Sequence, residues 1–163
     1  MKYFKLLILC LCLFTVSILT PSCQEDPCDE SCQNGSACIE GDCLCLDGTS
    51  GAECATVWRD KIVGTHSASG TCSINGAGTY DIMISKGTST DGVDIIEISD
   101  FYYGNVVTAK MIDENSFSFI STTSSSGIKV TSASGTINGS TVTMEFMGTD
   151  GASVDNCDLT FTI

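Results

Sequence analysis

Cysteine is the residue with which this sequence can do most chemistry. The chain has 11 cysteines among 163 residues, and six of them fall between residues 28 and 54. Thiols can pair as disulfides, hold a metal ion or act as nucleophiles, and an odd number leaves one thiol without a partner or with another role. The position of each cysteine along the chain separates these possibilities.

The N-terminal segment has the features of an export signal. Lys2 and Lys5 give a positive start, and residues 6–19 form an uncharged, mostly apolar run. This run has the length of a signal-peptide core and is short for a membrane span of ~20 residues. Cys10 and Cys12 lie inside it, where they serve as small apolar side chains.

The apolar run ends at Leu19-Thr20-Pro21-Ser22-Cys23, and no Ala for an ordinary cleavage site occurs before Ala37. This ending resembles the lipobox of bacterial lipoproteins, although Thr and Pro stand where that family prefers an aliphatic and a small residue. The resemblance implies that residues 1–22 are removed and that Cys23 is acylated, which anchors the protein to a lipid bilayer. Ordinary secretion with a relaxed cleavage site is the alternative.

With Cys23 acylated, eight cysteines remain, and an even set in an exported chain indicates a disulfide framework. Six of the eight form a block that has only three large apolar residues, so crosslinks must replace a hydrophobic core there. Six cysteines alone permit fifteen connectivities. The block consists of Cys28, Cys32, Cys38, Cys43, Cys45 and Cys54.

The block ends in the pattern C-x-C-x-x-G-x-x-G-x-x-C, which includes Gly48 and Gly51. With the cysteine spacing over residues 28–54, this pattern resembles an EGF-like domain. Thr49 stands where the family usually has an aromatic residue, so the resemblance gives no basis for packing against a following domain. The resemblance implies three disulfides: Cys28 with Cys38, Cys32 with Cys43, and Cys45 with Cys54.

Some EGF-like domains bind calcium through acidic residues before the first cysteine and a second element between the third and fourth. Glu25 and Asp26 supply the first feature. Only four residues separate Cys38 from Cys43, which leaves no room for the second. We therefore expect a solvated acidic surface and no metal.

From Ala55 onward, Thr, Ser, Gly, Ile and Val dominate and apolar residues alternate with polar ones. Alternation of period two predicts strands, and pairs such as Asn138-Gly139 and Asp150-Gly151 predict tight turns between them. No helical period follows the signal. We predict eight strands, at residues 60–73, 78–86, 93–101, 105–112, 115–121, 127–137, 141–148 and 155–163.

The two remaining cysteines, Cys72 and Cys157, fall in the first and last predicted strands. A disulfide between them would fasten the ends of the meander, which would otherwise leave exposed edges. We therefore predict an all-β fold in which residues 55–163 form an antiparallel up-and-down barrel or a barrel-like sandwich. This domain resembles the calycin and lipocalin group in strand number and order, with Trp58 before the first strand, although the G-x-W motif is absent.

The barrel domain is short for that group, which favours a filled interior over a roomy ligand cavity. The alternation places six large side chains inside: Tyr80, Phe117, Phe119, Met144, Phe146 and Phe161.

Charge limits the partners. The chain carries −13, and loss of Lys2 and Lys5 takes it to −15. Residues 23–58 hold eight acidic side chains and no Lys or Arg, so nucleic acid and anionic lipid surfaces would be repelled. Glu25 and Asp26 resemble the acidic tether, here residues 23–27, that directs some lipoproteins to the surface of the outer membrane.

No constellation for catalysis is evident, and we expect no enzyme and no cofactor. His66 is the only histidine, and we interpret it as a strand residue with a solvent-facing or hydrogen-bonded ring rather than a catalytic base. The polar residues near the last hairpin lack a cation-binding spacing and are interpreted as a polar turn. They are Asp150, Asp155, Asn156 and Asp158.

Two function classes remain. The first is a non-enzymatic surface lipoprotein whose EGF-like spacer presents the β-domain to a protein or glycan. The second is a lipocalin-like carrier of a small apolar ligand, which needs an apolar internal pocket above ~300 Å³.

Overall fold

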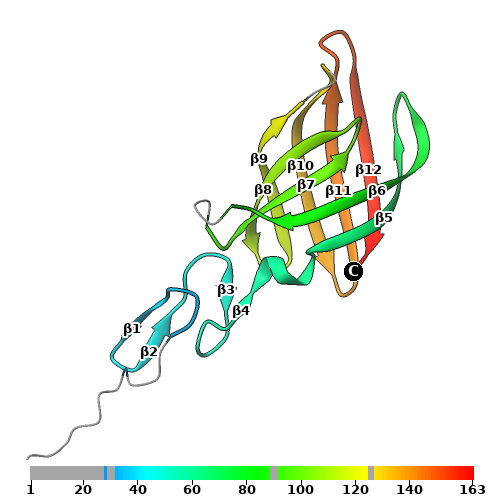
Figure 1. Ribbon diagram of the computed structural model, residues 1–163. Coiled ribbons are helices and arrows are strands. Elements are labelled where there is room, and N and C mark those ends of the chain that lie inside the picture. Colours follow the sequence, from blue (N-terminus) through cyan, green and yellow to red (C-terminus); the bar gives the residue numbers. More distant parts are fainter. Residues whose placement is uncertain (1–27, 29–31, 89–91, 125–126) are drawn as a thin grey trace, which may run out of the picture.

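The computed structural model describes residue 28 and residues 32–88, 92–124 and 127–163 (Figure 1). A small disulfide-rich region precedes a closed barrel of eight antiparallel strands. The all-β prediction is therefore confirmed.

Cys23, Glu25 and Asp26 lie outside the described residues. Among the described residues, no helix is long and apolar enough to cross a membrane.

The first part, which we call the cysteine-rich region, comprises Cys28 and residues 32–57. It contains two small antiparallel pairs, β1 (Ala37–Ile39) with β2 (Asp42–Leu44) and β3 (Thr49–Ser50) with β4 (Thr56–Val57). Its large apolar side chains, Ile39, Leu44 and Leu46, are all exposed, so crosslinks hold the region together. The disulfides join the pairs that the EGF-like resemblance implies: Cys28–Cys38, Cys32–Cys43 and Cys45–Cys54.

Each barrel strand pairs with the strand before and after it, and the last strand, β12, pairs with the first, β5. The first strand begins later than predicted, because residues from Trp58 to Lys61 form a 3-10 turn, η1, whose end is fixed by a hydrogen bond from the Ile62 N–H to the Arg59 carbonyl. The strands are β5 (Gly64–Cys72), β6 (Gly76–Lys86), β7 (Ile95–Phe101), β8 (Asn105–Asp113), β9 (Ser116–Thr123), β10 (Lys129–Asn138), β11 (Thr141–Thr149) and β12 (Val154–Thr162).

Alternate residues of each strand fill the interior. Of the six side chains predicted to point inward, Phe117, Met144, Phe146 and Phe161 are buried, while Tyr80 and Phe119 are half-buried and pack against the core. Glycines on the inner face make room for aromatic rings from other elements. A Cβ atom at Gly135 would lie 2.1 Å from the ring of Phe117, and one at Gly148 would lie 2.3 Å from the ring of Tyr102.

Cys72 and Cys157 form the fourth disulfide. They are direct partners in the β5–β12 ladder. The crosslink therefore joins the first and last strands of the barrel, as predicted from their positions in the sequence.

The barrel has two different ends. At the proximal end, β5 begins and β12 finishes, close to the cysteine-rich region (Figure 1). At the distal end lie the turns between β5 and β6, β7 and β8, β9 and β10, and β11 and β12.

The cysteine-rich region packs against the proximal end, although the expected aromatic residue is absent. The N–H of Trp58 donates to the Gly48 carbonyl at 2.9 Å. A Cβ atom at Gly48 would lie 2.7 Å from Asp94, which precedes β7, so the absence of a side chain allows the close approach. Lys110 then pairs with Asp47 of the cysteine-rich region at 3.3 Å and with Asp94 of the barrel at 3.1 Å.

Candidate functional site

A hollow at the distal end is lined by four residues from the β5–β6 turn, strand β6 and the β7–β8 turn: Asn75, Tyr80, Tyr102 and Tyr103. We call these four residues the tyrosine hollow. Its volume is about 230 Å³. A second hollow of about 140 Å³ shares three of the four residues and extends toward Ile128 and the β11–β12 turn.

The turn that carries the two adjacent tyrosines has an unusual backbone. Tyr102 and Tyr103 in the turn have positive φ angles of 26° and 61°, and Asp100, near the end of β7, has one of 56°. Non-glycine residues rarely adopt such angles, and each costs roughly 1–3 kcal/mol unless surrounding contacts hold it. Strained backbone of this kind concentrates at functional sites, which draws attention to this turn.

Contacts with three other elements hold Tyr102 in place. Its hydroxyl donates to Oδ2 of Asp155 at 2.8 Å, and its carbonyl accepts from Nδ2 of the fully buried Asn105 at 2.5 Å. Its ring packs edge-to-face on Phe146, with centroids 5.0 Å apart, and covers Gly148. Only 5% of Tyr102 is exposed.

Asp155 is the buried centre of the distal end. Its carboxylate accepts hydrogen bonds from the Ser73 hydroxyl, the Ile74 N–H, the Asn75 amide and the Tyr102 hydroxyl, at 2.6–3.0 Å. Burial by itself raises the pKa of Asp155, but these hydrogen bonds outweigh it and hold the pKa below its usual value. Burial, followed by the nearby Asp155 carboxylate, raises the pKa of Tyr102. Asp155 is therefore the ionised acceptor and Tyr102 the neutral donor.

Tyr103 and Asn75 complete this network. The Tyr103 hydroxyl donates to Oδ1 of Asn75 at 3.1 Å, and the Asn75 amide also reaches the Tyr102 hydroxyl at 3.2 Å. The Tyr103 ring stands edge-on to that of Tyr102, with centroids 4.9 Å apart and planes at 85°. Because 53% of Tyr103 remains exposed, it offers aromatic surface to a ligand while its hydroxyl stays paired.

The charges of the barrel are unevenly distributed. Four of the five Lys and Arg residues that the structure describes lie near the proximal end, where they contact carboxylates, carbonyls or an amide: Arg59, Lys61, Lys86 and Lys110. Lys129, at the start of β10, is the only Lys or Arg in the described distal turns and strand ends. Asp100, Asp150 and Asp155 therefore give the distal end a negative field.

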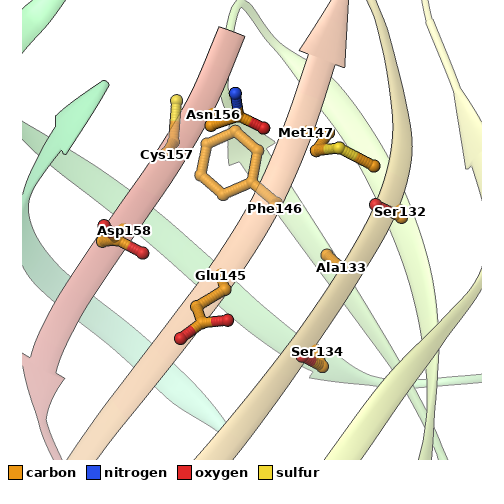
Figure 2. Close-up of a pocket in the computed structure, with 9 residues that line it drawn as sticks. All are labelled: Ser132, Ala133, Ser134, Glu145, Phe146, Met147, Asn156, Cys157 and Asp158. Carbon is orange, nitrogen blue, oxygen red and sulfur yellow. The ribbon is translucent and has the colours of Figure 1, made fainter. Parts of the chain in front are cut away.

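A larger groove of about 410 Å³ crosses the outer face of β10, β11 and β12 (Figure 2). Glu145 and Asp158 lie directly opposite each other in it, an arrangement of like charges that disfavours the pairing. The groove is open, and its lining mixes the carboxylates and other polar groups with the exposed side chain of Met147. Its lining residues are Ser132, Ala133, Ser134, Glu145, Phe146, Met147, Asn156, Cys157 and Asp158.

The polar residues predicted to form a turn near the last hairpin are not brought together. Asp155 points into the barrel, while Asn156 and Asp158 are exposed on its outer face. Asp150 accepts the N–H groups of Ala152 and Ser153 in its own turn, each at 2.8 Å. Asp150 therefore caps a polar turn, as expected, and Asp155 has a separate role that the turn pattern did not indicate.

Asp155 also lies beside the disulfide that closes the barrel, with its carboxylate within 4.8 Å of the sulfur atoms of Cys72 and Cys157. Metal binding by cysteine needs the thiolate. Because these two sulfur atoms are bonded to each other, they are not available as ligands.

His66 is a hydrogen-bonded strand residue, as predicted. Its Nε2 lies 2.9 Å from the Ile62 carbonyl, and its ring lies 4.9 Å from that of Phe161. These contacts hold the ring against the proximal part of the core.

The tyrosine hollow was not predicted from the sequence. Tyr102 and Tyr103 stand in a hairpin turn, where Gly, Asn or Asp is usual. Two adjacent bulky aromatic residues in a turn are the sequence feature that could have identified this site. Asn75 stands before Gly76, and such a pair indicates a tight turn but no binding role.

Comparisons with protein-family models, with curated proteins and with solved structures returned no match.

Proposed function

We propose that this protein is a non-enzymatic lipoprotein of the outer-membrane surface, anchored by acylated Cys23. In this proposal the cysteine-rich region is an EGF-like spacer, and the barrel binds a protein or glycan at its distal end. In this proposal the barrel recognises a binding partner and catalyses no reaction.

The observation that carries this proposal is the location of the tyrosine hollow at the end of the barrel opposite the cysteine-rich region. Cys23 precedes that region in the chain. An anchor at Cys23 directs the proximal end toward the bilayer, so the hollow faces away from it. A binding surface for an external partner belongs at that position.

The contacts at the proximal end support a spacer that holds the barrel in one orientation. Lys110 links Asp47 to Asp94, and the Trp58 N–H donates to Gly48. A spacer joined in this way presents the distal end in a constant direction, which favours capture of an extended or surface-bound partner.

The carrier alternative requires space inside the barrel. Phe117 fills the position over Gly135, and Tyr102 fills the position over Gly148. The hollows described above open to solvent at the distal end or on the outer face. These features favour binding at the surface over carriage of an apolar ligand.

Epitope accessibility tests the proposal. A short epitope is inserted at Gly151 in the distal β11–β12 turn of the full-length protein, with a matched insertion at Gly139 in the proximal β10–β11 turn. A side chain at either glycine would meet no other atom within 4 Å. We expect antibody to label the Gly151 epitope on intact cells at least as strongly as the Gly139 epitope. Labelling of both epitopes only after permeabilisation would contradict exposure at the surface.

A further inference from the structure

The lining of the tyrosine hollow differs from that of the other hollows. Three of its four residues are aromatic. The groove between β9 and β10 is lined mainly by Ser and Thr residues, and the groove of Figure 2 is lined mainly by Ser, Asn and carboxylates. Aromatic surface therefore collects at the distal end.

The hydrogen-bonding groups of the hollow are already paired with one another. Asn75 uses its amide on Asp155 and Tyr102 and its oxygen on Tyr103, and the Tyr102 hydroxyl is committed to Asp155. Within the described residues, Tyr80 has the only hydroxyl of the lining without a hydrogen-bond partner. A sugar ring bound here would find few hydrogen-bond partners for its hydroxyl groups, which would lose their hydrogen bonds to water. A ligand without hydrogen-bonding groups would lose no such bonds.

The electrostatics favour a positively charged ligand. The Asp155 carboxylate accepts a hydrogen bond from the Tyr102 hydroxyl and lines the adjoining hollow, so it places a negative charge next to the tyrosine hollow. The face of an aromatic ring attracts cations. Asp150 adds negative charge from the adjoining hollow.

The size of the hollow favours a small group. Its volume of about 230 Å³ lies below the roughly 300–1,000 Å³ of sites for drug-sized ligands. The Tyr103 ring stands edge-on to the Tyr102 ring at 85°. Because Tyr102 is almost fully buried and 53% of Tyr103 is exposed, Tyr103 supplies the open aromatic wall. The hydrogen bonds of Tyr102 and Tyr103 fix both rings before a ligand arrives, which reduces the entropy lost on binding.

We propose that the tyrosine hollow binds a quaternary ammonium group of the choline type against the exposed ring of Tyr103, with Tyr80 and Tyr102 completing the aromatic lining. Such a cation has no N–H to donate and is recognised by aromatic faces and negative charge. This inference rests on the proposed function only in placing the binding surface at the distal end.

The test is calorimetric titration of the full acylated protein in a maltoside detergent, which carries no choline group. The ligands are choline and 3,3-dimethyl-1-butanol, a neutral analogue with carbon in place of the charged nitrogen. We expect choline to bind at least about tenfold more tightly than the alcohol, since the cation–π attraction requires the charge. Equal affinity for the two would overturn the proposal, and so would absence of choline binding.

Two variants of one residue localise the site. Tyr103→Asn removes the ring but suits the positive φ of 61°, and should weaken choline binding by about tenfold. Tyr103→Phe keeps the ring and should retain most of the affinity. Loss of affinity in both variants to the same extent would overturn the role of the aromatic face.

Two further ligands identify the source of the cation. Tighter binding of choline than of phosphocholine indicates a free or terminal cation, and the reverse order indicates a phosphate-esterified headgroup. Both orders support recognition of the ammonium group. Binding of neutral sugars without choline, lost in Tyr103→Asn, would overturn this inference and leave the proposed function standing.

Discussion

Cys72 and Cys157 face each other across the ladder that joins the first and last strands of the barrel, with Cα atoms 4.0 Å apart. They are separated by 85 residues in sequence, so their bond encloses nearly the whole barrel. The barrel is therefore closed both by main-chain pairing and by a covalent link at the same strand pair.

Removal of this link should destabilise the barrel strongly. In the chain-entropy account, a closed loop of this length restrains the unfolded state by roughly 4–5 kcal/mol. We expect Cys72→Ala combined with Cys157→Ala to lower the Tm of the barrel by about 10 °C or more, measured by calorimetry. Peptide mapping of the wild type should recover the Cys72–Cys157 peptide. A bridge from either residue to a cysteine of the cysteine-rich region would contradict the closure.

Asp155 should make the stability of the barrel depend on pH. Its pKa in the folded protein lies below the value of ~3.9 for an unfolded chain. Its ionised form therefore stabilises the fold above about pH 4, and this contribution is lost as the pH falls through the folded pKa. We expect the Tm of the wild type to fall more steeply below pH 4 than that of Asp155→Asn.

At pH 7, Asp155→Asn should itself lower the stability by roughly 1.5–3 kcal/mol, because it replaces hydrogen bonds to a charged acceptor. Asp158→Asn on the same strand is the matched control. It removes a charge opposite Glu145 and should leave the Tm unchanged or raise it. Equal pH profiles for the wild type and Asp155→Asn would contradict the role assigned to Asp155.

The junction at the proximal end can be tested with two glycines. Gly48 and Gly51 have similar φ angles of 90° and 94°, so alanine strains the backbone equally at both. Gly48→Ala would also bring a Cβ atom to 2.7 Å from Asp94, while at Gly51 the nearest atom is 3.6 Å away. We expect Gly48→Ala to speed proteolysis between residues 55 and 63 several-fold more than Gly51→Ala. Equal rates would show that Gly48 does not pack on the barrel.

The filled interior can be tested with Gly135 and Phe117. A methyl group at Gly135 would overlap the Phe117 ring, and we expect Gly135→Ala to cost roughly 1–3 kcal/mol. Phe117→Leu removes the overlapping ring atoms, so the double variant should be more stable than the sum of the two single effects predicts. Strict additivity in urea titrations would indicate free space between the two residues.

The strands were predictable because each has one face buried and one exposed. In β11, Val142, Met144 and Phe146 are buried and alternate with exposed residues, which is the pattern visible in the sequence. The start of β5 was predicted too early, because residues 60–63 roughly continue the alternation of apolar and polar residues. In the structure the N–H groups of Ile62 and Val63 donate to the Arg59 carbonyl, so this segment forms and follows η1 instead of a strand. The alternation alone does not reveal those hydrogen bonds.

The tyrosine hollow and the junction were not predictable for a related reason. The position of Tyr102 depends on Asp155, which lies 53 residues later. The positive φ angle of Tyr102 is not one that the intrinsic preferences of tyrosine would predict. The packing of Gly48 depends on Asp94, which only the folded chain brings close. Both features arise from long-range contacts, which neither composition nor spacing reveals.

The central claim, a barrel presented from a lipid anchor, is tested most directly by metabolic labelling with an alkyne analogue of palmitate. The wild type and Cys23→Ser are expressed as full-length chains and compared by labelling and by membrane fractionation. We predict that the wild type is labelled and found in the membrane, and that Cys23→Ser is unlabelled and soluble. Equal labelling of the two proteins, or absence of label from the wild type, would contradict the claim.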